Sequence, residues 1–462
     1  MTKAVVDECC GTPAAPTGCE SRAPEVRENV RPVGAMAERD RFGNAVDSSV
    51  GYARGMILSD SYAETLRNSQ GMERLRIRVK QLGAESVHDF TGSPSEFPLE
   101  PDDLAVETRE PIGPALFGPR LRQLALRHMG GREDDEAAVF NRTSAGIIAT
   151  EAALCSAGDT IISVVPGSVS HPSIKRGASI ARAVLVEVAT PGELEKVLAE
   201  TTGPLVMVTG VTSELIVMPE ETFLETLRIA RRAGRTVVVD DAYGARVRTA
   251  LYAQPEARRA GADLAITSNN KAGLHGPRAG LLVGEAGLVR AALSKAAELG
   301  QESRAPLALG VLRSLERYRP EQLRAEAALG QSLYAALADR LGHNRVVRTA
   351  LGPCVEEDDL LTIATERTKA TSAKPVVVPA EAAASLGMLL LEHHGILTVN
   401  ALSSPGARAS LRLKAGEETV QRMGGVEAVA AAVDDGLERL GRVVHDVAAM
   451  RRLILGDAGP LP

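Results

Sequence analysis

The middle of the chain alternates short apolar runs with longer segments whose apolar residues recur at helical spacing. Short runs of this kind predict buried β-strands, and the longer segments predict amphipathic helices. The predicted strands are Thr160 to Val165, Leu205 to Val211, Thr236 to Asp240, Leu264 to Ser268 and Gly280 to Val283. Strands that alternate with helices form a parallel sheet covered by helices on both faces. The fold class is therefore predicted to be α/β.

The pattern changes after this region. The chain is rich in alanine and helical in pattern as far as Leu341, and shorter apolar runs then precede a predicted helix near Val426 to Leu440. We expect strands at Leu360 to Ala364, Pro375 to Val378, Ile396 to Val399 and Ala409 to Leu413. These elements predict a separate, smaller α+β domain.

The patterns divide the chain into four parts. Residues 1 to 45 mix Pro, Gly, Thr, Glu and Arg without apolar periodicity, so we expect a disordered leader. Residues 46 to 105 are predicted to form a helical arm that is not an autonomous domain. Residues 106 to 330 are predicted to form a large domain around the parallel sheet, and residues 331 to 462 the small C-terminal domain.

Composition and charge exclude several classes of protein. The chain has 462 residues, 44% of them apolar and 24% charged, which is typical of a large globular protein. Its 53 basic and 59 acidic residues give a net charge of −6, a poor match for nucleic acid or an anionic membrane surface. No apolar run approaches the ~18 residues of a membrane span, and we find no secretory signal. We expect a soluble, cytoplasmic protein without nucleic-acid or membrane partners.

The five cysteines do not form a disulfide framework for a chain of this length. Cys9, Cys10 and Cys19 crowd the N-terminal region, whereas Cys155 and Cys354 are isolated. A closed zinc site needs about four ligands, and no histidine stands near the first three cysteines. We expect free thiols and no metal site, and the role of the N-terminal cysteines stays open.

Three strand ends in the middle region supply complementary chemistry. An apolar strand ends at Asp240, where a carboxylate points into the crevice at the carboxyl ends of the strands. Lys271 follows the next strand, among small residues that let another group approach closely. Residues 141 to 151 introduce a helix with small hydroxyl residues, and the amides of a helix N-terminus suit a phosphate.

A lysine, a carboxylate and a phosphate cradle at strand ends are what pyridoxal phosphate requires. The lysine amine forms a Schiff base with the cofactor. The carboxylate keeps the pyridine nitrogen protonated, so that the ring accepts electrons from the α-carbon of a substrate. Asp241 has the same chemistry as Asp240, so residue type alone does not choose between the two acids.

The run Lys-Ala-Gly-Leu-His-Gly-Pro-Arg-Ala-Gly-Leu-Leu-Val-Gly, which begins at Lys271, resembles the fold-type I pyridoxal-phosphate enzymes. Within them it is similar to the selenocysteine synthase group (seryl-tRNA selenium transferases). The resemblance covers residues 110 to 318, with a weaker echo in the C-terminal domain. It implies a large, mostly parallel-sheet domain, a smaller α+β domain, and a homodimer or higher homo-oligomer.

The resemblance also implies roles for individual residues. Lys271 is expected to form the Schiff base, and Asp240, the first acid of an Asp-x-Ala-aromatic motif, to contact the pyridinium nitrogen. His171 is expected to stack on the cofactor ring, and Tyr243 to donate to the cofactor's phenolic oxygen. The implied phosphate ligands are Thr143, Ser144, Gly146, Ser268 and Arg278.

The C-terminal domain is expected to supply the substrate clamp. Arg408, Ser410, Arg412 and Lys414 alternate, and so share one face of a predicted strand. A guanidinium group fits an α-carboxylate in bidentate geometry. We expect Arg412, which resembles the family position, to bind the substrate carboxylate, with Arg408 as the alternative.

We predict an enzyme that binds an α-amino acid as an external aldimine and generates an α-carbanion, or quinonoid. The arm is acidic overall, and Tyr243 stands where the selenocysteine synthase pattern has small residues. Both features argue against a tRNA substrate, because phosphate contacts dominate such binding. We therefore expect a small or nucleoside-linked amino acid as substrate.

Three reactions compete at the α-carbon: α,β-elimination or replacement, retro-aldol or transaldol cleavage, and decarboxylation in which O2 captures the carbanion. Selenocysteine-synthase-like enzymes of capuramycin-type nucleoside antibiotic pathways carry out the last reaction, and this chain's composition and divergent arm are similar to theirs. We rank this O2-dependent monooxygenase-decarboxylase reaction, which yields a carboxamide, first. A non-catalytic pyridoxal-phosphate-binding regulator stays an alternative, although we find no basic helix-turn-helix segment.

Overall fold

The computed structural model describes residues 39–167, 169–368, 375–414 and 416–456. All of them belong to one compact unit of the chain, Pro32–Pro462. The predicted leader as far as residue 38, and with it the three N-terminal cysteines, lies outside the described residues. Among the described residues, no helix is both long and apolar enough to cross a lipid bilayer.

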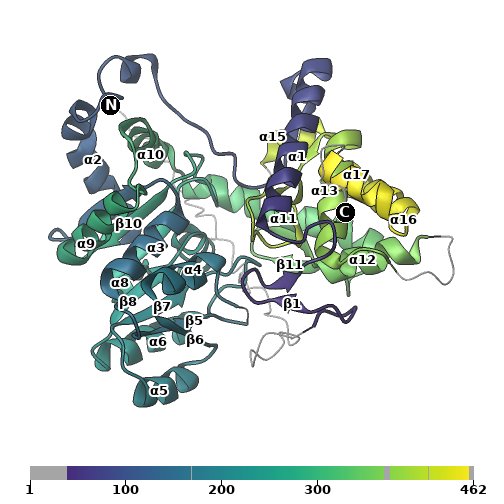
Figure 1. Ribbon diagram of the computed structural model, residues 1–462. Helices are drawn as coiled ribbons and strands as arrows, with labels where there is room; N and C mark the ends of the chain where they lie inside the picture. Colours follow the sequence, from purple (N-terminus) through teal and green to yellow (C-terminus); the bar gives the residue numbers. More distant parts are fainter. Residues whose placement is uncertain (1–38, 168, 369–374, 415, 457–462) are drawn as a thin grey trace, which may run out of the picture. The chain divides into compact units, whose positions relative to one another are not determined.

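A seven-stranded sheet forms from the middle of the chain. Its strands are β4 (Glu136–Phe140), β5 (Thr160–Val164), β6 (Val184–Val188), β7 (Leu205–Thr209), β8 (Thr236–Asp240), β9 (Leu264–Ser268) and β10 (Gly280–Gly284). Their order across the sheet is β4-β10-β9-β8-β7-β5-β6 (Figure 1). Strand β10 is antiparallel to both β4 and β9, and the other neighbouring pairs in this sheet are parallel. The mostly parallel sheet confirms the predicted α/β class.

Helices cover both faces of this sheet and enclose an apolar core on each side. One face carries α3 (Thr143–Leu154), α4 (Pro172–Ala181) and α9 (Ala286–Glu298). The other carries α2 (Ile112–Met129), α5 (Pro191–Glu200), α6 (Glu220–Arg232), α8 (Ala257–Ala260) and α10 (Ala305–Arg317). Because successive strand residues point to opposite faces, Val238 packs toward α3 and its neighbours Val237 and Val239 pack toward α6.

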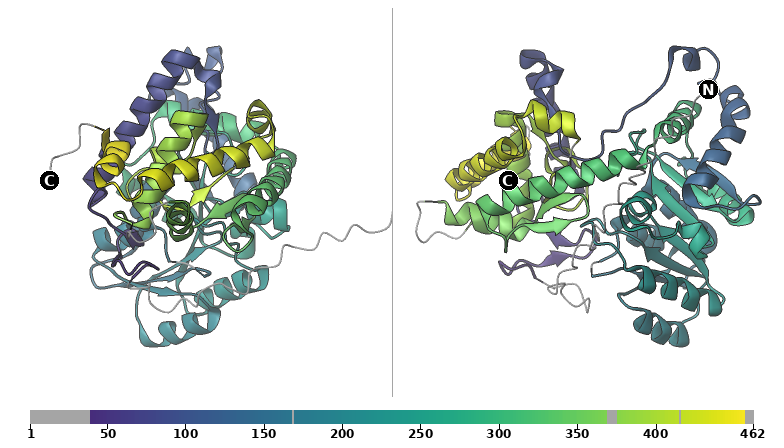
Figure 2. Two further views of the ribbon diagram at one scale, coloured as in Figure 1. Left: turned by 90° about the vertical axis from the view of Figure 1, so that its right-hand side faces the viewer. Right: turned by 180° about the vertical axis from the view of Figure 1, so that it is seen from behind.

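A smaller, antiparallel sheet lies in the C-terminal part of the chain. It consists of β11 (Val347–Thr349), β12 (Gly352–Val355) and β14 (Leu411–Arg412). The helices around it are α11 (Pro320–Leu341), α12 (Glu357–Glu366), α13 (Pro379–His394), α14 (Val399–Leu402), α15 (Glu417–Arg422), α16 (Val426–Val443) and α17 (Val447–Leu455). The long helix α11 leads from the first sheet toward the second (Figure 2).

The predicted arm packs against C-terminal elements. It contains β1 (Val46–Asp47), β2 (Tyr52–Ala53), α1 (Ser61–Leu82) and β3 (His88–Asp89), and two single-turn helices at Ala84–Ser86 and Pro101–Leu104. Helix α1 packs against α13, α14 and α17, and β3 pairs in parallel with β13 (Ile396–Leu397). Apolar residues of the arm, such as Leu58 and Phe90, are buried in the C-terminal core.

Two predicted C-terminal strands are wrong. Residues Leu360 to Ala364 lie inside α12, and Pro375 to Val378 form no strand. The runs at 396–399 and 409–413 contain strands of only two residues each, β13 and β14. A short apolar run fits a buried helix as well as a strand, and periodicity alone does not separate the two.

Candidate active site

Asp240 ends β8 on the face of the sheet that α3 covers. Its side chain is buried, with 5% of the residue exposed, and its carboxylate accepts a hydrogen bond from the Ala242 N–H at 3.2 Å. Burial raises the pKa of Asp240 to about 6, although the Ala242 N–H and the Lys271 ammonium oppose this rise. Asp240 is therefore a buried acid on which the charge of Lys271 acts directly.

Asp241 points to the opposite face. Its carboxylate forms a bidentate pair with Arg248, which donates from Nε at 3.1 Å and from Nη2 to the second oxygen, and both side chains are fully buried. The Arg248 guanidinium also stacks on the Phe223 ring of α6, 4.1 Å from its centre. Asp241 is thus paired with Arg248 in the core that α6 covers.

Lys271 lies in the loop after β9, and a buried arginine holds this loop. Arg246, in the short helix α7 (Gly244–Arg246), donates from Nε to the Lys271 carbonyl at 3.1 Å and from Nη2 to the Ser268 carbonyl at 2.7 Å. The Lys271 Nζ lies 4.6 Å from the centre of the Tyr243 ring. The structure thus brings the side chains of Lys271 and Tyr243 together, and the hydrogen bonds from Arg246 hold the loop backbone at Ser268 and Lys271.

Tyr243 contacts a second lysine that our sequence analysis gave no role. Lys414 donates from Nζ to the Tyr243 hydroxyl at 2.9 Å, and its Nζ lies 5.0 Å from the ring centre. Burial alone would raise the pKa of Tyr243, but Lys414, Lys271 and Arg412 together lower it to about 7. Lys414 was recognisable only as the last residue of the alternating Arg-x-Ser-x-Arg-x-Lys pattern.

His171 lies at the N-terminus of α4, within reach of the Lys271 charge. Its Nδ1 accepts the Ser173 N–H at 3.2 Å and lies 2.7 Å from the Ser173 hydroxyl. Burial, together with Lys271 and Arg176, lowers the pKa of His171 to about 3. The imidazole is therefore neutral at physiological pH, with Nδ1 as an acceptor.

The N-terminus of α3 forms an anion cradle. The first amides of a helix have no partner within it, and the side chain of Arg142, the residue before α3, does not cap them. Gly280 pairs with Ser268 in the sheet, and a Cβ atom on Gly280 would lie 2.7 Å from the Thr143 Cα. Gly146 likewise lets the helix approach Ile266 closely. The predicted ligands Thr143, Ser144, Gly146 and Ser268 thus share one region.

Three arginines add positive charge to this cradle. Burial lowers the pKa of Arg142, and the charges of Arg278 and Arg176 lower it further. Arg278 was predicted as a phosphate ligand, and its side chain is exposed. Arg142 and Arg176 escaped the sequence analysis, because like charges from separate segments do not form a local motif. The hydroxyl of Ser268 donates to Asn270 at 2.7 Å.

The two candidate substrate arginines differ in their partners. Arg408 forms an ion pair with Glu214 and donates to the Gly51 carbonyl at 3.2 Å. Arg412 is buried and donates to the Ser213 carbonyl, but its Nε has no hydrogen-bond partner among the described residues. Arg412 acts on Tyr243 through its charge, whereas the charge of Arg408 is compensated.

Glu151 is a buried acid that the sequence analysis also missed. It lies on α3, and neither of its carboxyl oxygens has a hydrogen-bond partner among the described residues. Burial, and the neighbouring charge of Asp240, raise its pKa well above the usual value. The sequence indicates Glu151 only as the one acidic residue among the small, mostly apolar residues of 143–154.

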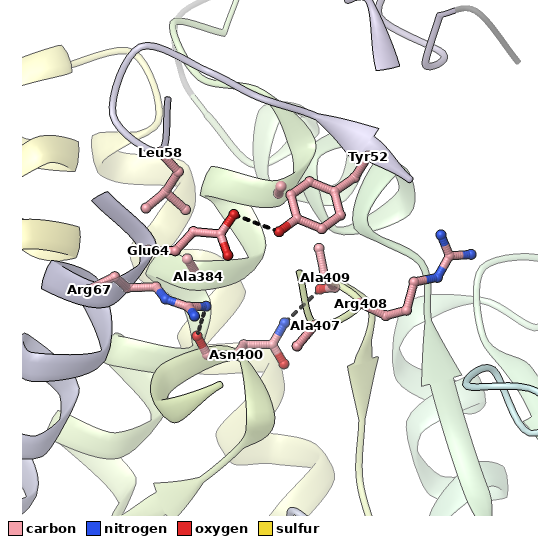
Figure 3. Close-up of a pocket in the computed structure, with 10 residues that line it drawn as sticks. Tyr52, Leu58, Glu64, Arg67, Ala384, Asn400, Ala407, Arg408 and Ala409 are labelled. Atoms are coloured by element: carbon pink, nitrogen blue, oxygen red, sulfur yellow. Dashed lines mark hydrogen bonds between the residues drawn. The ribbon is translucent and has the colours of Figure 1, made fainter. Parts of the chain in front are cut away.

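A small cavity lies where the arm meets the C-terminal core, and Arg408 is among the residues that line it (Figure 3). Tyr52 donates to Glu64 at 2.8 Å across it, and Arg67 donates to the Asn400 carbonyl at 2.9 Å. Its volume of about 20 Å³ holds about one water molecule. The cavity is therefore part of the packing of the arm.

Comparison with known proteins identifies a family and relatives of this chain. Residues 101–423 match the family model of the class I and II aminotransferases. A UPF0425 pyridoxal phosphate-dependent protein of Methanothermobacter thermautotrophicus is 35% identical over 401 residues, which cover 87% of this chain and 100% of the relative. A protein of the same description from Methanosphaera stadtmanae is 29% identical, over 82% of this chain and 95% of the relative.

Solved structures show the same fold at low sequence identity. A SepCysS–SepCysE N-terminal domain complex matches with a TM-score of 0.55 and 14% identity, over 79% of this chain and 98% of the matched chain. The L-threonine transaldolase of Pseudomonas fluorescens matches with a TM-score of 0.53 and 14% identity, over 86% of this chain and 91% of the matched chain. The fold is that of the fold-type I pyridoxal-phosphate transferases.

Proposed function

This chain belongs to the aminotransferase class I and II family, and from that premise we propose that it is an enzyme that breaks a bond at the α-carbon of an amino acid. Its cofactor is pyridoxal phosphate, as in its pyridoxal phosphate-dependent relatives. When bound, this cofactor draws electrons from the α-carbon of an amino acid and so weakens one of its bonds. The convergence of Lys271, Asp240 and the α3 cradle carries the proposal.

The described residues fit each functional group of the cofactor. Lys271 supplies an amine for the aldehyde, and Asp240 supplies a buried carboxylate to hold a proton on the ring nitrogen. The uncapped first turn of α3, with Ser268 and Arg278, suits the phosphate group. His171 offers a neutral imidazole ring that can lie flat against the cofactor.

We assign the α-carboxylate of the substrate to Arg412. Its buried Nε lacks a partner among the described residues, and a guanidinium binds a carboxylate through two parallel hydrogen bonds. Arg408 is already paired with Glu214. This difference supports Arg412 over Arg408.

The reaction that we rank first is oxidative decarboxylation. One amino acid and one O2 molecule would give one carboxamide, one CO2 and one water, which balances atoms and electrons. The similarity of the Lys271 run to the selenocysteine-synthase-like enzymes supports this choice. The alternatives that use the same residues are elimination or replacement at the β-carbon, and aldol or transaldol cleavage.

The first experiment tests which amine holds the cofactor. The purified protein is reduced with borohydride in the presence of pyridoxal phosphate, and its peptides are analysed by mass spectrometry. We expect the pyridoxyl group on Lys271 and not on Lys414, although both amines flank Tyr243. Lys271→Ala should abolish the label and the visible absorbance of the bound cofactor. A label on any other lysine would contradict the proposal.

The second experiment tests the reaction. An oxygen electrode, combined with assays for CO2 and carbonyl products, is used with a panel of free and nucleoside-linked amino acids. Oxygen uptake equal to CO2 release supports oxidative decarboxylation. Aldehyde or keto-acid products without oxygen uptake identify cleavage or elimination instead. A labelled Lys271 with no turnover of any amino acid identifies a binding protein.

We further propose that the partners are an amino-acid substrate and a second copy of the chain. Large apolar side chains are exposed along one stretch, with Leu104, Ile112 and Leu116 at 61%, 46% and 58% exposure. Exposed apolar patches mark association surfaces. Light scattering should give the mass of at least a dimer, and Leu116→Glu should lower it.

A further inference from the structure

Tyr243 is enclosed by positive charge from three segments. Lys271 lies over its ring at 4.6 Å, and Lys414 both lies over it at 5.0 Å and donates to its hydroxyl at 2.9 Å. Arg412, two residues before Lys414, and Arg246, after Tyr243 on α7, are the other charged groups coupled to this ring. Tyr243 and Lys414 are each only 6% exposed.

No carboxylate neutralises Lys414 within the described residues. Its described side-chain hydrogen bond goes to Tyr243, and the ionisable groups that act on it most strongly are Tyr243, Arg412 and Lys271. A buried ammonium without a counter-ion is costly, because burial removes its hydration. The hydroxyl of Tyr243 is the group within reach that can become the missing anion.

The arm fixes the position of Lys414. The Lys414 backbone N–H donates to the Phe90 carbonyl at 3.1 Å, and Lys414 forms a parallel bridge with Thr91. A Cβ atom on Gly92 would lie 2.7 Å from the Lys414 Cβ, so glycine is required for this approach. Lys414 is therefore held against Tyr243 by a segment distant in the sequence.

Building on the proposed function, we propose that Lys414 and Tyr243 form a proton-accepting pair: the Lys414 ammonium holds Tyr243 as a phenolate, whose Oη takes the proton that the substrate's α-ammonium group must lose. The N–H bond of the substrate breaks, its electron pair stays on nitrogen, and an O–H bond forms on Tyr243. The substrate amine then carries the lone pair that it needs to bond to carbon. Tyr243 is the catalytic residue of the pair, and Lys414 is a positioning residue. As a phenolate, Tyr243 accepts hydrogen bonds, so this role replaces the donation to the cofactor's phenolic oxygen that the resemblance implies.

The electrostatics of the pair agree with this role. Burial opposes ionisation of Tyr243, yet the three neighbouring cations bring the pKa of Tyr243 to about 7. Burial also lowers the pKa of Lys414, while Tyr243 opposes that change. A base whose pKa lies near the working pH is deprotonated to a substantial extent and still binds a proton strongly enough to take it from the substrate.

The composition of the chain allows a direct test. The chain has no tryptophan and six tyrosines, so the near-ultraviolet absorbance of tyrosinate is easily resolved. Burial raises the pKa of Tyr52, Tyr252 and Tyr318, whereas the pKa of Tyr243 is lowered by its cationic neighbours. The cofactor is removed from the full chain by dialysis against an aminothiol. The protein is then titrated from about pH 5 to about pH 9, a range that lies below the usual pKa of tyrosine.

We expect the absorbance change of one tyrosine with a midpoint near pH 7. Tyr243→Phe should remove this step. Lys414→Met should raise its midpoint by at least about one pH unit, whereas Lys414→Arg, which keeps the charge, should raise it less. Lys196→Met, at an exposed lysine of α5, is the matched control and should leave the midpoint unchanged.

With an active substrate, the acidic limb of the pH profile of kcat/KM should follow the same midpoint and move with it in Lys414→Met. The proposal is wrong if no tyrosine titrates below about pH 9, or if Lys414→Met leaves the midpoint unchanged in a protein with wild-type circular dichroism. It is also wrong if the titration behaves as expected while the pH profile does not move. The absorbance titration needs no cofactor, so it separates failure of this pair from failure of the proposed function.

Discussion

Asp240 and Asp241 are adjacent in the sequence but point to opposite faces of the seven-stranded sheet. Asp240 lies on the α3 side, where the Lys271 ammonium acts on its carboxylate. Asp241 is fully buried on the α6 side in a bidentate pair with Arg248. Residue type leaves the two acids equivalent, whereas strand geometry gives them different surroundings. Substitution of each acid should therefore have a different consequence.

Asp240→Asn should remove activity without unfolding the protein. An amide cannot hold a proton on the ring nitrogen, and loss of one preorganised charge typically costs about 100-fold to 1,000-fold in kcat. Burial raises the pKa of Asp240 to about 6, so ionisation above that pH costs the folded state free energy. We expect the free energy of unfolding of the cofactor-free variant at pH 8 to equal or exceed that of the wild type. A variant with full kcat would contradict the role of Asp240.

Asp241→Asn should have the opposite profile. It leaves the buried charge of Arg248 without its partner, and breaking such a pair costs about 3 to 5 kcal/mol. We expect this loss in the free energy of unfolding, measured by urea denaturation followed by circular dichroism. The folded fraction should still carry the pyridoxyl label on Lys271. Stability equal to that of Asp240→Asn would refute the division between the two acids.

The strands of the large sheet could be predicted where they are buried on both sides. Five predicted strands coincide with β5, β7, β8, β9 and β10 to within two residues. The missed strands β4 and β6 are the two edges of the sheet. Strand β6 is partly exposed and Glu187 interrupts its apolar residues, whereas β4 carries a run of only four apolar residues, Ala137 to Phe140. The pattern of apolar residues therefore predicts the sheet centre better than its edges.

The sequence predicts the candidate site residues only where a local motif marks them. Lys271, Asp240 and the α3 cradle each follow or precede an element that the sequence marks clearly. Lys414 and Arg246 act on groups that other elements supply, so no local pattern indicates their partners. The apolar run at 360–364 predicts a strand but lies in α12, because an apolar run this short indicates burial and does not distinguish a strand from a helix.

Gly280→Ala should weaken cofactor binding. The added Cβ would lie 2.7 Å from the Thr143 Cα and 2.8 Å from the Arg142 carbonyl oxygen, so the backbone at the start of α3 must move away from the sheet. We expect the dissociation constant of pyridoxal phosphate to rise about tenfold or more, measured by fluorescence titration. Gly287→Ala, at an exposed position of α9, is the matched control and should bind like the wild type. Equal affinity of the Gly280 variant would argue against the cradle.

Arg412→Gln and Arg408→Gln should separate substrate binding from folding. Loss of a charged hydrogen-bond pair to the substrate carboxylate should raise KM about 10-fold to 100-fold in Arg412→Gln. Arg408→Gln breaks the pair with Glu214, so we expect a lower melting temperature and a smaller change in KM. Steady-state kinetics and thermal melts of both variants provide the comparison. The reverse pattern would assign the substrate to Arg408.

Glu151 should make the stability of the cofactor-free protein fall as pH rises. Its pKa in the folded state is raised by burial and by Asp240, so the folded protein keeps a proton that the unfolded chain releases above about pH 4.5. Stability is then greatest below the unfolded pKa and falls by up to about 1.4 kcal/mol per pH unit until the folded pKa is reached. Glu151→Gln cannot ionise, so its free energy of unfolding, measured by urea denaturation from about pH 5 to about pH 8, should fall less than that of the wild type. Glu418→Gln, at an exposed position, should follow the wild type. Parallel curves for Glu151→Gln and the wild type would mean that Glu151 does not hold a proton in the folded state.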